Sequence, residues 1–544
     1  MENFDYDLRS IQEARNLLRQ GKKASEEFAF FTEEQVERII KNMVKVAQEN
    51  AVLLGEMAHE DTGFGKSFDK AYKNYAASKL LYDDIKDIKT IGVLNRDEKT
   101  HTVEIAEPVG LVMGIVPSTN PTSTIIFKSI IALKSRNGII FSPHPSAMKC
   151  SLKAAELMRD AAIEAGAPEG IISCITMPSI GTTNELMKSK EVALIIATGG
   201  PGMVKAAYSA GKPAIGVGAG NSPAYIEKTA NVKEAVEKII ASKTFDNGTI
   251  CASEQSIICE ESNYEEVVRE FSRQGGYFMS EEETNTVCKM LFKPGTTAMN
   301  AKFVGRDAKY IAQAAHISVP ENTKVLIGKQ CGVGKDNPLS FEKLTCVLAF
   351  YVVKDWHEAC ELSINLLQNG IGHTMSIHSN DEDIIMKFAS KPASRILVNT
   401  GGSQGGTGIS TGLLTSFTLG CGTHGGSSVS ENVGPKHLVN IKRVAYGIKD
   451  VRTLVADDMD FKKVVEGKCA CCQEESHSCH DNTPSTRTHD TMGLSPKEIV
   501  ALFESNENKR ADEGSHNGCT SGNKELTSKE QELKDLVLEL IKSV

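Results

Sequence analysis

The segment FDNGTICASEQ, residues 245–255, holds one cysteine, Cys251, among small and polar side chains. A cysteine thiolate is a strong nucleophile toward a carbonyl carbon, and a covalent intermediate divides one difficult reaction into two easier steps. The competing interpretation is a buried thiol that serves only as a small apolar side chain. The segment alone leaves both interpretations open.

Glycine-rich segments indicate where phosphate groups could bind. EVALIIATGGPGMVKAAYSAG, residues 191–211, predicts a strand that ends at Thr198, a glycine turn and then a helix, which is the geometry that holds a dinucleotide. IGVGAGN, residues 215–221, does not run from a strand into a helix, and by itself it favours a loop where backbones approach closely. KQCGVGKDN, near Lys335, lacks the glycine spacing and the Ser or Thr of a phosphate loop and is rejected.

The elements that must position these motifs alternate in type. Up to about Asp457, short apolar runs such as VGLVMGIV, ALIIAT and VLAFYVV alternate with amphipathic stretches such as SLKAAELMRDAAIEAG. This alternation predicts an α/β chain with largely parallel sheets. From about Asp458 onward the sequence becomes polar and loses its apolar periodicity, which predicts disordered linkers around two short amphipathic segments.

Composition limits the classes of function. The 544 residues exceed the size of one hydrophobic core, so two or more domains are expected. The net charge of −9 and the lack of a long apolar stretch argue against nucleic acid and membrane partners. Residues 1–30 contain no secretory signal, so a cytoplasmic protein is expected. In that reducing environment the 14 cysteines are predicted to be free thiols.

Five elements in order resemble the aldehyde dehydrogenase superfamily over roughly residues 5–455. They are PSTNP (117–121), ATGGPG (197–202), GAGNSP (218–223), FDNGTICASEQ and Glu342 of FEKLTC. The resemblance implies Cys251 as the catalytic thiol and an α/β fold with a Rossmann-like dinucleotide-binding domain, an α/β catalytic domain and a β oligomerisation element. Eight other cysteines are predicted to be small buried hydrophobes: Cys150, Cys174, Cys259, Cys288, Cys331, Cys346, Cys360 and Cys421.

One departure from the family pattern narrows the expected activity. Hydrolytic members have a glutamate, the general base for water, at the position occupied here by Val217. Without that base, an acyl group on Cys251 would wait for a better nucleophile, and a thiol such as that of coenzyme A is one. The stretches VPSTNPTST, FSPHPSA and GIGHTMSIHS resemble the CoA-acylating members, including the dehydrogenase half of bifunctional aldehyde-alcohol dehydrogenases. No alcohol dehydrogenase half follows, so aldehyde oxidation without alcohol formation is expected.

The resemblance implies a role for each site residue. Cys251 would attack the aldehyde, the Asn120 amide and the Cys251 backbone N–H would hold the oxyanion, and Glu342 would bind the nicotinamide ribose. His373 would assist thiol deprotonation, or it is a structural histidine; Asn120 could also be a turn former, and Glu342 a solvated acid. The expected cofactor-binding residues are Pro117, Ser118, Ser142, Pro143, His144, Thr198, Gly199, Gly200, Gly218 and Glu342.

The expected cofactors are NAD and CoA, and no metal site is predicted. Ser142 and Pro145 stand where the family has a lysine and an acid near the adenosine ribose, so discrimination against NADP need not be strong. Expected substrates are short aldehydes of two to four carbons, such as propionaldehyde or acetaldehyde. The alternatives are an acyl-phosphate reductase, a hydrolytic aldehyde dehydrogenase and a non-catalytic scaffold.

The resemblance also implies domain bounds. Residues 1–85 and 108–244 would form the dinucleotide-binding domain, and 245–435 the catalytic domain. Residues 86–107 and 436–457 would pair a hairpin with a late strand and join two or four subunits.

The end of the chain suggests a targeting segment. After a linker, 458–523, residues 524–544 place apolar side chains on one face of a helix. The segment resembles the encapsulation peptides that bind shell proteins of bacterial microcompartments, although a helix folded back on its own oligomer is the alternative. The cysteines and histidines of the linker are interpreted as plain thiols and imidazoles rather than metal ligands.

Overall fold

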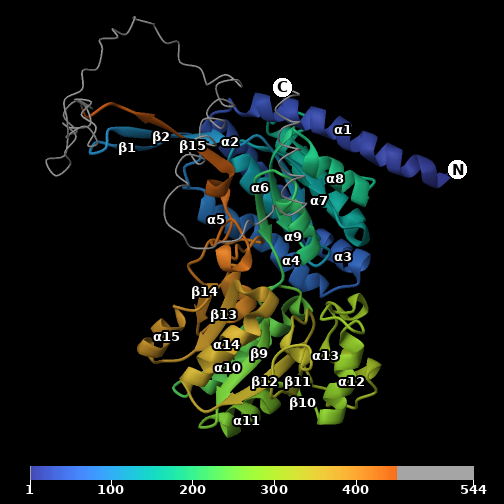
Figure 1. Ribbon diagram of the computed structural model, residues 1–544. Helices are drawn as coiled ribbons and strands as arrows, with labels where there is room; N and C mark the ends of the chain where they lie inside the picture. The colour runs from blue at the N-terminus through green and yellow to red at the C-terminus, as the bar shows by residue number, and fades with distance from the viewer. Residues whose placement is uncertain (1, 450–544) are drawn as a thin grey trace, which may run out of the picture. The chain divides into compact units, whose positions relative to one another are not determined.

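A computed structural model describes residues 2–449, which form three β-sheets and the helices around them (Figure 1). The α-helices are α1 (Glu2–Phe28), α2 (Glu33–Glu49), α3 (Ala51–Thr62), α4 (Ser67–Tyr75), α5 (Leu81–Ile85), α6 (Pro121–Lys134), α7 (Met148–Glu164), α8 (Ile180–Lys188), α9 (Pro201–Tyr208), α10 (Val232–Thr244), α11 (Tyr264–Gln274), α12 (Glu281–Leu291), α13 (Ala308–Ala314), α14 (Trp356–Leu367), α15 (Glu382–Phe388) and α16 (Gly402–Gly406). The strands are β1 (Gly92–Asp97), β2 (Thr102–Pro108), β3 (Leu111–Ile115), β4 (Gly138–Ser142), β5 (Ile172–Cys174), β6 (Val192–Thr198), β7 (Ala214–Val217), β8 (Ser222–Ile226), β9 (Glu254–Glu260), β10 (Gly276–Phe278), β11 (Val325–Lys329), β12 (Val347–Val353), β13 (Gly372–His378), β14 (Ala393–Val398) and β15 (Val439–Ala445).

The first sheet is parallel and has the strand order β5-β4-β3-β6-β7. β3 and β4 are buried along their whole length, as expected of parallel strands covered on both faces. β6 ends at Thr198 and α9 begins at Pro201, which confirms the predicted strand, glycine turn and helix. The chain leaves β3 toward β4 on one side and returns to β6 on the other, so the strand order reverses beside β3. Ligands of open α/β sheets bind at such a point.

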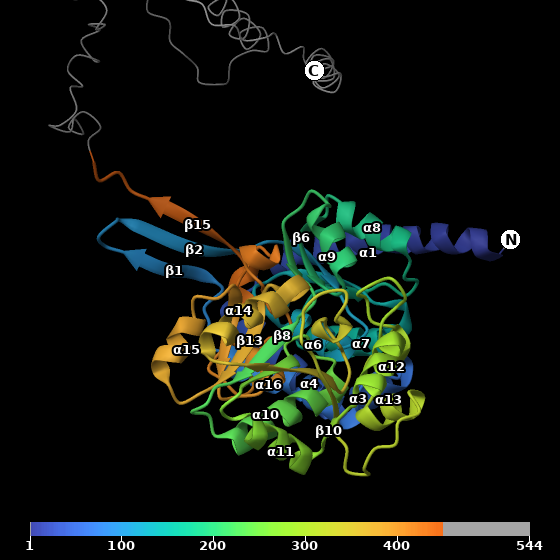
Figure 2. The ribbon, with the colours of Figure 1, turned by 60° about the horizontal axis from the view of Figure 1, so that its bottom comes forward.

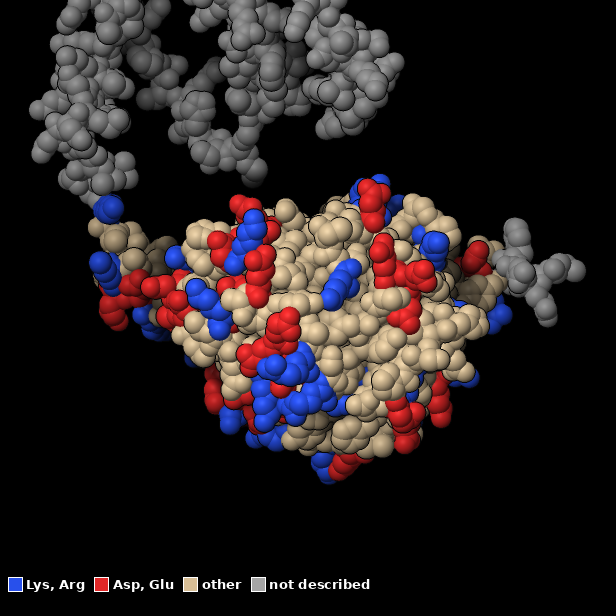
Figure 3. Space-filling model, turned by 90° about the horizontal axis from the view of Figure 1, so that it is seen from below, with Lys and Arg blue, Asp and Glu red and all other residues tan. Residues whose placement is uncertain are grey.

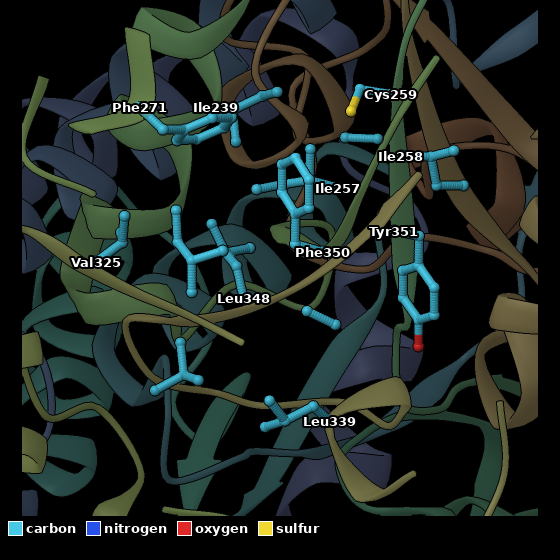
Figure 4. Close-up of a cluster of buried hydrophobic side chains, with 14 of the residues drawn as sticks. Ile239, Ile257, Ile258, Cys259, Phe271, Val325, Leu339, Leu348, Phe350 and Tyr351 are labelled. Atoms are coloured by element: carbon cyan, nitrogen blue, oxygen red, sulfur yellow. The ribbon is translucent and has the colours of Figure 1, made fainter. Parts of the chain in front are cut away.

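The second sheet is also parallel, with the order β10-β11-β12-β9-β8-β13-β14. Its core contains Ile257 and Ile258 of β9 and the ring of Phe350 on β12, packed edge to face against Phe271 (Figure 4). Cys259 lies in the same cluster, so this thiol is a small buried hydrophobe as predicted. Together the two sheets confirm the predicted α/β fold with parallel sheets.

Three predictions about the two parallel sheets and their loops were wrong: one domain boundary and the burial of two cysteines. The boundary at 244/245 is misplaced, because β8 and α10 belong to the second sheet and its core rather than to the first. The short run SPAYI carried no signal of which sheet it would join. Cys331 is exposed rather than buried, because it lies in a loop after β11. Cys174 is partly exposed.

The third sheet is antiparallel, with the order β1-β2-β15, and it stands away from the two parallel sheets (Figure 2). Ile441 of β15 pairs with Ala106 of β2, which confirms the predicted pairing of hairpin and late strand. Along and just after β15 the apolar side chains of Ile441, Val444 and Tyr446 are exposed. A role of this sheet in joining subunits stays a prediction.

The remaining predictions concern the end of the chain, membrane spans, metal ligands and surface charge. Residues 450–457, the linker 458–523 and the segment 524–544 lie outside the described residues. Within residues 2–449, no helix is long and apolar enough to cross a membrane, and no three potential metal ligands cluster. Figure 3 shows acidic and basic side chains mixed over one face, with one local group of basic residues.

Candidate active site

A cavity of about 820 Å³ opens where the carboxyl ends of β3, β4, β6 and β7 meet the segment that carries Cys251. The structure brings twelve of the predicted site residues into its lining: Pro117, Ser118, Asn120, Ser142, Pro143, His144, Thr198, Gly199, Gly200, Gly218, Cys251 and Glu342. The thirteenth, His373, lies behind the lining and contacts Cys251. The convergence follows from parallel pairing, which places the loops after neighbouring strands at one edge.

The cavity has room for a nucleotide at the glycine turns. At Gly200 and at Gly218, a Cβ atom would meet no other atom within 4 Å, so the backbone stands open toward the cavity. Gly200 caps α9, whose first backbone N–H groups face an anion favourably. In the same lining, the Nδ1 atom of His144 accepts a hydrogen bond from the Ser146 backbone N–H at 3.2 Å. These residues fit a dinucleotide.

Charge is sparse in this cavity. Among the described lining residues, Glu342 is the one carboxylic acid, His144 is the one imidazole, and no Lys or Arg is present. Its Oε1 atom accepts a hydrogen bond from the Gly220 backbone N–H at 2.8 Å. Burial raises the pKa of Glu342 to about 7. The carboxyl group is therefore held at the cavity wall and is divided between its two protonation states near neutral pH.

Cys251 and His373 form a pair. The Nε2 atom of His373, on β13, lies 3.2 Å from the Cys251 Sγ atom. Burial, with a smaller contribution from Glu342, raises the pKa of Cys251 to about 12. Burial, together with the charge of Arg395, holds the pKa of His373 well below its usual range. At neutral pH the pair is a neutral thiol beside a neutral imidazole, which has a lone pair for the thiol proton.

The ring of His373 is held from behind by two residues that the sequence did not indicate. Its Nδ1 atom lies 2.8 Å from the Thr374 hydroxyl, and that hydroxyl accepts a hydrogen bond from Arg395 Nε at 3.2 Å. Arg395 also donates to the His373 carbonyl oxygen at 3.1 Å. Arg395 comes from the neighbouring strand β14, and only strand pairing brings it to this position.

Asn120 lies at the start of α6, where Pro121 is the first helical residue. Its Nδ2 atom lies 3.1 Å from the Thr119 hydroxyl and 3.4 Å from the Thr249 carbonyl oxygen. No described residue accepts a hydrogen bond from the Cys251 backbone N–H. Two N–H donors thus stand at the same cavity, as an oxyanion site requires.

Val217, at the position of the glutamate of hydrolytic members, is part of an apolar wall of the cavity. Val217 is buried beside Ile250 and Leu419 and lines the cavity near Cys251. Gly220 approaches so closely that a Cβ atom there would lie 1.8 Å from the Cys251 carbonyl oxygen. The segment 215–221 comprises the end of β7 and the loop that follows it. Its glycines favoured a close backbone approach, which Gly220 makes, and the segment borders Cys251.

The fold and the site define the class of protein, an α/β enzyme with a crevice that fits a dinucleotide and a cysteine-histidine pair beside it. Residues 6–282 match the model of the aldehyde dehydrogenase family. The chain belongs to the aldehyde dehydrogenase family.

Individual members of the family that resemble this chain include bifunctional and acetylating aldehyde dehydrogenases. The chain is 48% identical over 443 residues to the bifunctional aldehyde-alcohol dehydrogenase of Escherichia coli, covering 80% of this chain and 50% of that protein. It thus spans about half the length of the first curated relatives it matches. An acetylating aldehyde dehydrogenase from Geobacillus thermoglucosidasius has 51% identity and a TM-score of 0.80, covering 82% of this chain and 98% of its own.

Two solved structures of lower sequence identity are propionaldehyde dehydrogenases, and one of them contains bound CoA. A propionaldehyde dehydrogenase from Rhodopseudomonas palustris, solved with bound CoA and an acylated cysteine, has 26% identity and a TM-score of 0.72 over 80% of this chain and 97% of its own. A propionaldehyde dehydrogenase from a fucose utilisation microcompartment of Clostridium phytofermentans has 27% identity and the same TM-score, over 80% of this chain and 97% of its own. These neighbours agree with the resemblance to acylating members.

Proposed function

We propose that this chain oxidises a short-chain aldehyde to its acyl-CoA thioester, with NAD as hydride acceptor and CoA as acyl acceptor. The observation that carries the proposal is the pairing of Cys251 with His373 at 3.2 Å beside an apolar Val217. A nucleophile with a proton acceptor is present, whereas the glutamate that activates water in hydrolytic members is replaced. The balanced reaction consumes aldehyde, NAD⁺ and CoA and releases acyl-CoA, NADH and one proton.

The residues divide the work as follows. His373 accepts the thiol proton, and the Cys251 thiolate forms a C–S bond to the aldehyde carbon. The Asn120 amide and the Cys251 backbone N–H stabilise the negative oxygen of the tetrahedral adduct. NAD, when bound at the glycine turns, supplies the acceptor for the hydride that leaves this carbon, and a thioester remains on Cys251. The CoA sulfur then attacks the thioester carbonyl, and the C–S bond to Cys251 breaks.

The walls near Cys251 support a small apolar substrate. Val217, Phe417 and Leu419 line the cavity and offer no charged partner to a substrate chain. We therefore propose acetaldehyde or propionaldehyde, with the alternatives distinguished by kcat/KM over a series of two to four carbons. NAD is the proposed cofactor, although no carboxylate among residues 142–146 would repel the 2′-phosphate of NADP.

One observation favours a second candidate. Glu342 places a carboxyl group in the same cavity, so water activation by Glu342 would give a hydrolytic aldehyde dehydrogenase. An acyl-phosphate reductase is less well supported, because no Lys or Arg among the described residues lines the cavity to bind phosphate.

The deciding experiment mixes purified protein with propanal and NAD, with and without CoA, and follows NADH and products. The acylating function predicts sustained NADH and propionyl-CoA with CoA, and at most one NADH per site without it. Steady propionate formation without CoA would establish the hydrolytic alternative. Replacement of CoA by inorganic phosphate tests the acyl-phosphate reaction, for which no turnover is expected.

Assembly and location are part of the proposal. The exposed apolar side chains of β15 support a dimer or tetramer joined through the third sheet.

The amphipathic pattern of residues 524–544 supports docking on microcompartment shell proteins. Deletion of these residues should leave activity in solution unchanged and abolish co-localisation with shells. A fluorescent protein fused to the segment should be recruited to shells, and a diffuse signal would contradict this role.

A further inference from the structure

The geometry points to Lys73 as a positioning residue that orients the Asn120 amide for the oxyanion. The inference rests on the proposed function, since it assigns a partner to the residue that would stabilise the adduct. It concerns α4, an element that lies outside all the motifs on which the family likeness depends.

In the hydrogen bond between Lys73 and Asn120, only the lysine can be the donor. The Nζ atom of Lys73 donates to Asn120 Oδ1, and Lys73 is buried, with a relative exposure of 1%. An ammonium group donates hydrogen bonds and accepts none, so the amide oxygen must face the lysine. The Nδ2 atom then faces the other way. One of its N–H groups donates to the Thr119 hydroxyl at 3.1 Å. The other makes a contact of 3.4 Å with the Thr249 carbonyl oxygen, which exceeds the usual length, so this second N–H is available to a substrate oxygen.

Asp246 fixes the lysine. Its Oδ2 atom accepts hydrogen bonds from Lys73 Nζ, from Lys70 Nζ at 3.0 Å and from the Thr249 hydroxyl at 2.6 Å. Its Oδ1 atom accepts from the Lys66 backbone N–H at 2.7 Å. Asp246 belongs to the turn that precedes Cys251, so one buried carboxylate ties α4, Asn120 and the nucleophile segment together.

The backbone around this carboxylate is shaped for the contact. Asp246 has a φ of 46°, a conformation that non-glycine residues rarely adopt. A Cβ atom at Gly65 would lie 1.8 Å from Asp246 Oδ1, so only glycine fits there. A strained backbone such as that of Asp246 persists when the surrounding contacts require it. Here the contact that requires it is the hydrogen bond between the Asp246 carboxylate and Lys73.

The charges leave a net positive site behind Asn120. Two buried lysines, Lys70 and Lys73, face one buried carboxylate, Asp246, while Lys66 and Asp69 pair nearby at 3.7 Å. One positive charge therefore remains beside the amide. Burial lowers the pKa of Lys73 to about 8, so its charged form predominates at pH 7. A positive charge at this place favours the negative oxygen of the adduct and not the neutral aldehyde, and this difference is what accelerates a reaction.

The test measures the pre-steady-state rate of NADH formation with propanal and NAD in the absence of CoA. Removal of one oxyanion donor costs about 100-fold or more in rate. K73M keeps the Asn120 donor but removes the group that orients it, so we expect this rate to fall by about tenfold or more. KM for NAD should stay unchanged. K73R, which restores charge and donors, should recover part of the rate. K70M is the comparison variant, because it removes the same charge from Asp246 and a hydrogen bond to the Thr119 carbonyl oxygen but leaves the contact of Lys73 with Asn120 Oδ1. Its loss should be clearly smaller than that of K73M.

A double-mutant cycle separates positioning from general damage. If Lys73 acts through Asn120, K73M should add little in an N120A background. Independent, multiplicative effects, or equal losses in K73M and K70M, would overturn the role of Lys73. If K73M does not fold, K73Q replaces it in the cycle, since glutamine keeps an uncharged donor. A wild-type protein that forms no NADH would instead refute the proposed function and not the positioning alone.

Discussion

The imidazole Nε2 of His373 lies 3.2 Å from the Sγ atom of Cys251, although 122 positions separate the two residues in the chain. The thiol comes from the turn before β9 and the imidazole from β13, so the pair exists only in the folded second sheet. Because burial raises the pKa of the thiol and lowers that of the imidazole, the neutral pair is favoured in the free enzyme. In the proposed reaction the thiol proton therefore passes to His373 only as Cys251 attacks the aldehyde.

Replacement of the nucleophile should abolish the reaction. C251A should form no NADH with propanal, NAD and CoA, because no other thiol lines the described part of the cavity. The matched control is C331A, which removes an exposed thiol and should keep full activity. A C251A variant with more than about a few per cent of the wild-type rate would show that another group is the nucleophile.

Restoring a base at position 217 should change the acyl acceptor. V217E should release propionate and turn over NAD continuously without CoA, because a carboxylate beside the thioester activates water. V217Q has nearly the same size without the base and should remain dependent on CoA. Equal CoA-independent rates in the two variants would mean that the residue at this position does not decide between water and CoA.

The reactivity of the free enzyme toward iodoacetamide should increase with pH. Since burial raises the pKa of Cys251 to about 12, the thiolate fraction is far from saturation between pH 7 and pH 10. It should grow about tenfold per pH unit, and alkylation of the peptide that contains Cys251, measured by mass spectrometry, should grow with it. A plateau near pH 8 would show a thiol of ordinary or lowered pKa.

The hydroxyl of Thr374 should matter for the rate of acylation. T374V keeps the shape of the side chain but removes the 2.8 Å contact with His373 Nδ1. The imidazole would lose the group that holds its orientation, and we expect a rate of NADH formation about three- to tenfold lower, as for the loss of a buried hydrogen bond. S376A on the same strand is the control, because the Ser376 hydroxyl has no partner among the described residues. Equal effects in both variants would contradict a role for Thr374.

Much of the fold and the site could be predicted because the signals are local. Cys251, Asn120 and the glycine turns follow strands or precede helices in short, readable segments, and parallel strands bring the loops at their carboxyl ends to one edge. The cavity lining was therefore predictable once the motifs were ordered. The boundary at 244/245 was not, since a short apolar strand such as β8 carries no mark of the sheet that it joins.

By itself the sequence determined the order of the motifs, the absence of a glutamate at Val217 and the alternation of strands and helices, all of which are properties of neighbouring residues. Only the tertiary structure decided that His373 meets Cys251, that Arg395 holds His373 through Thr374, and that Lys73 contacts Asn120. The physical reason is that each of these contacts joins side chains from different elements. Burial and packing, rather than any spacing along the chain, place their polar atoms within hydrogen-bond distance.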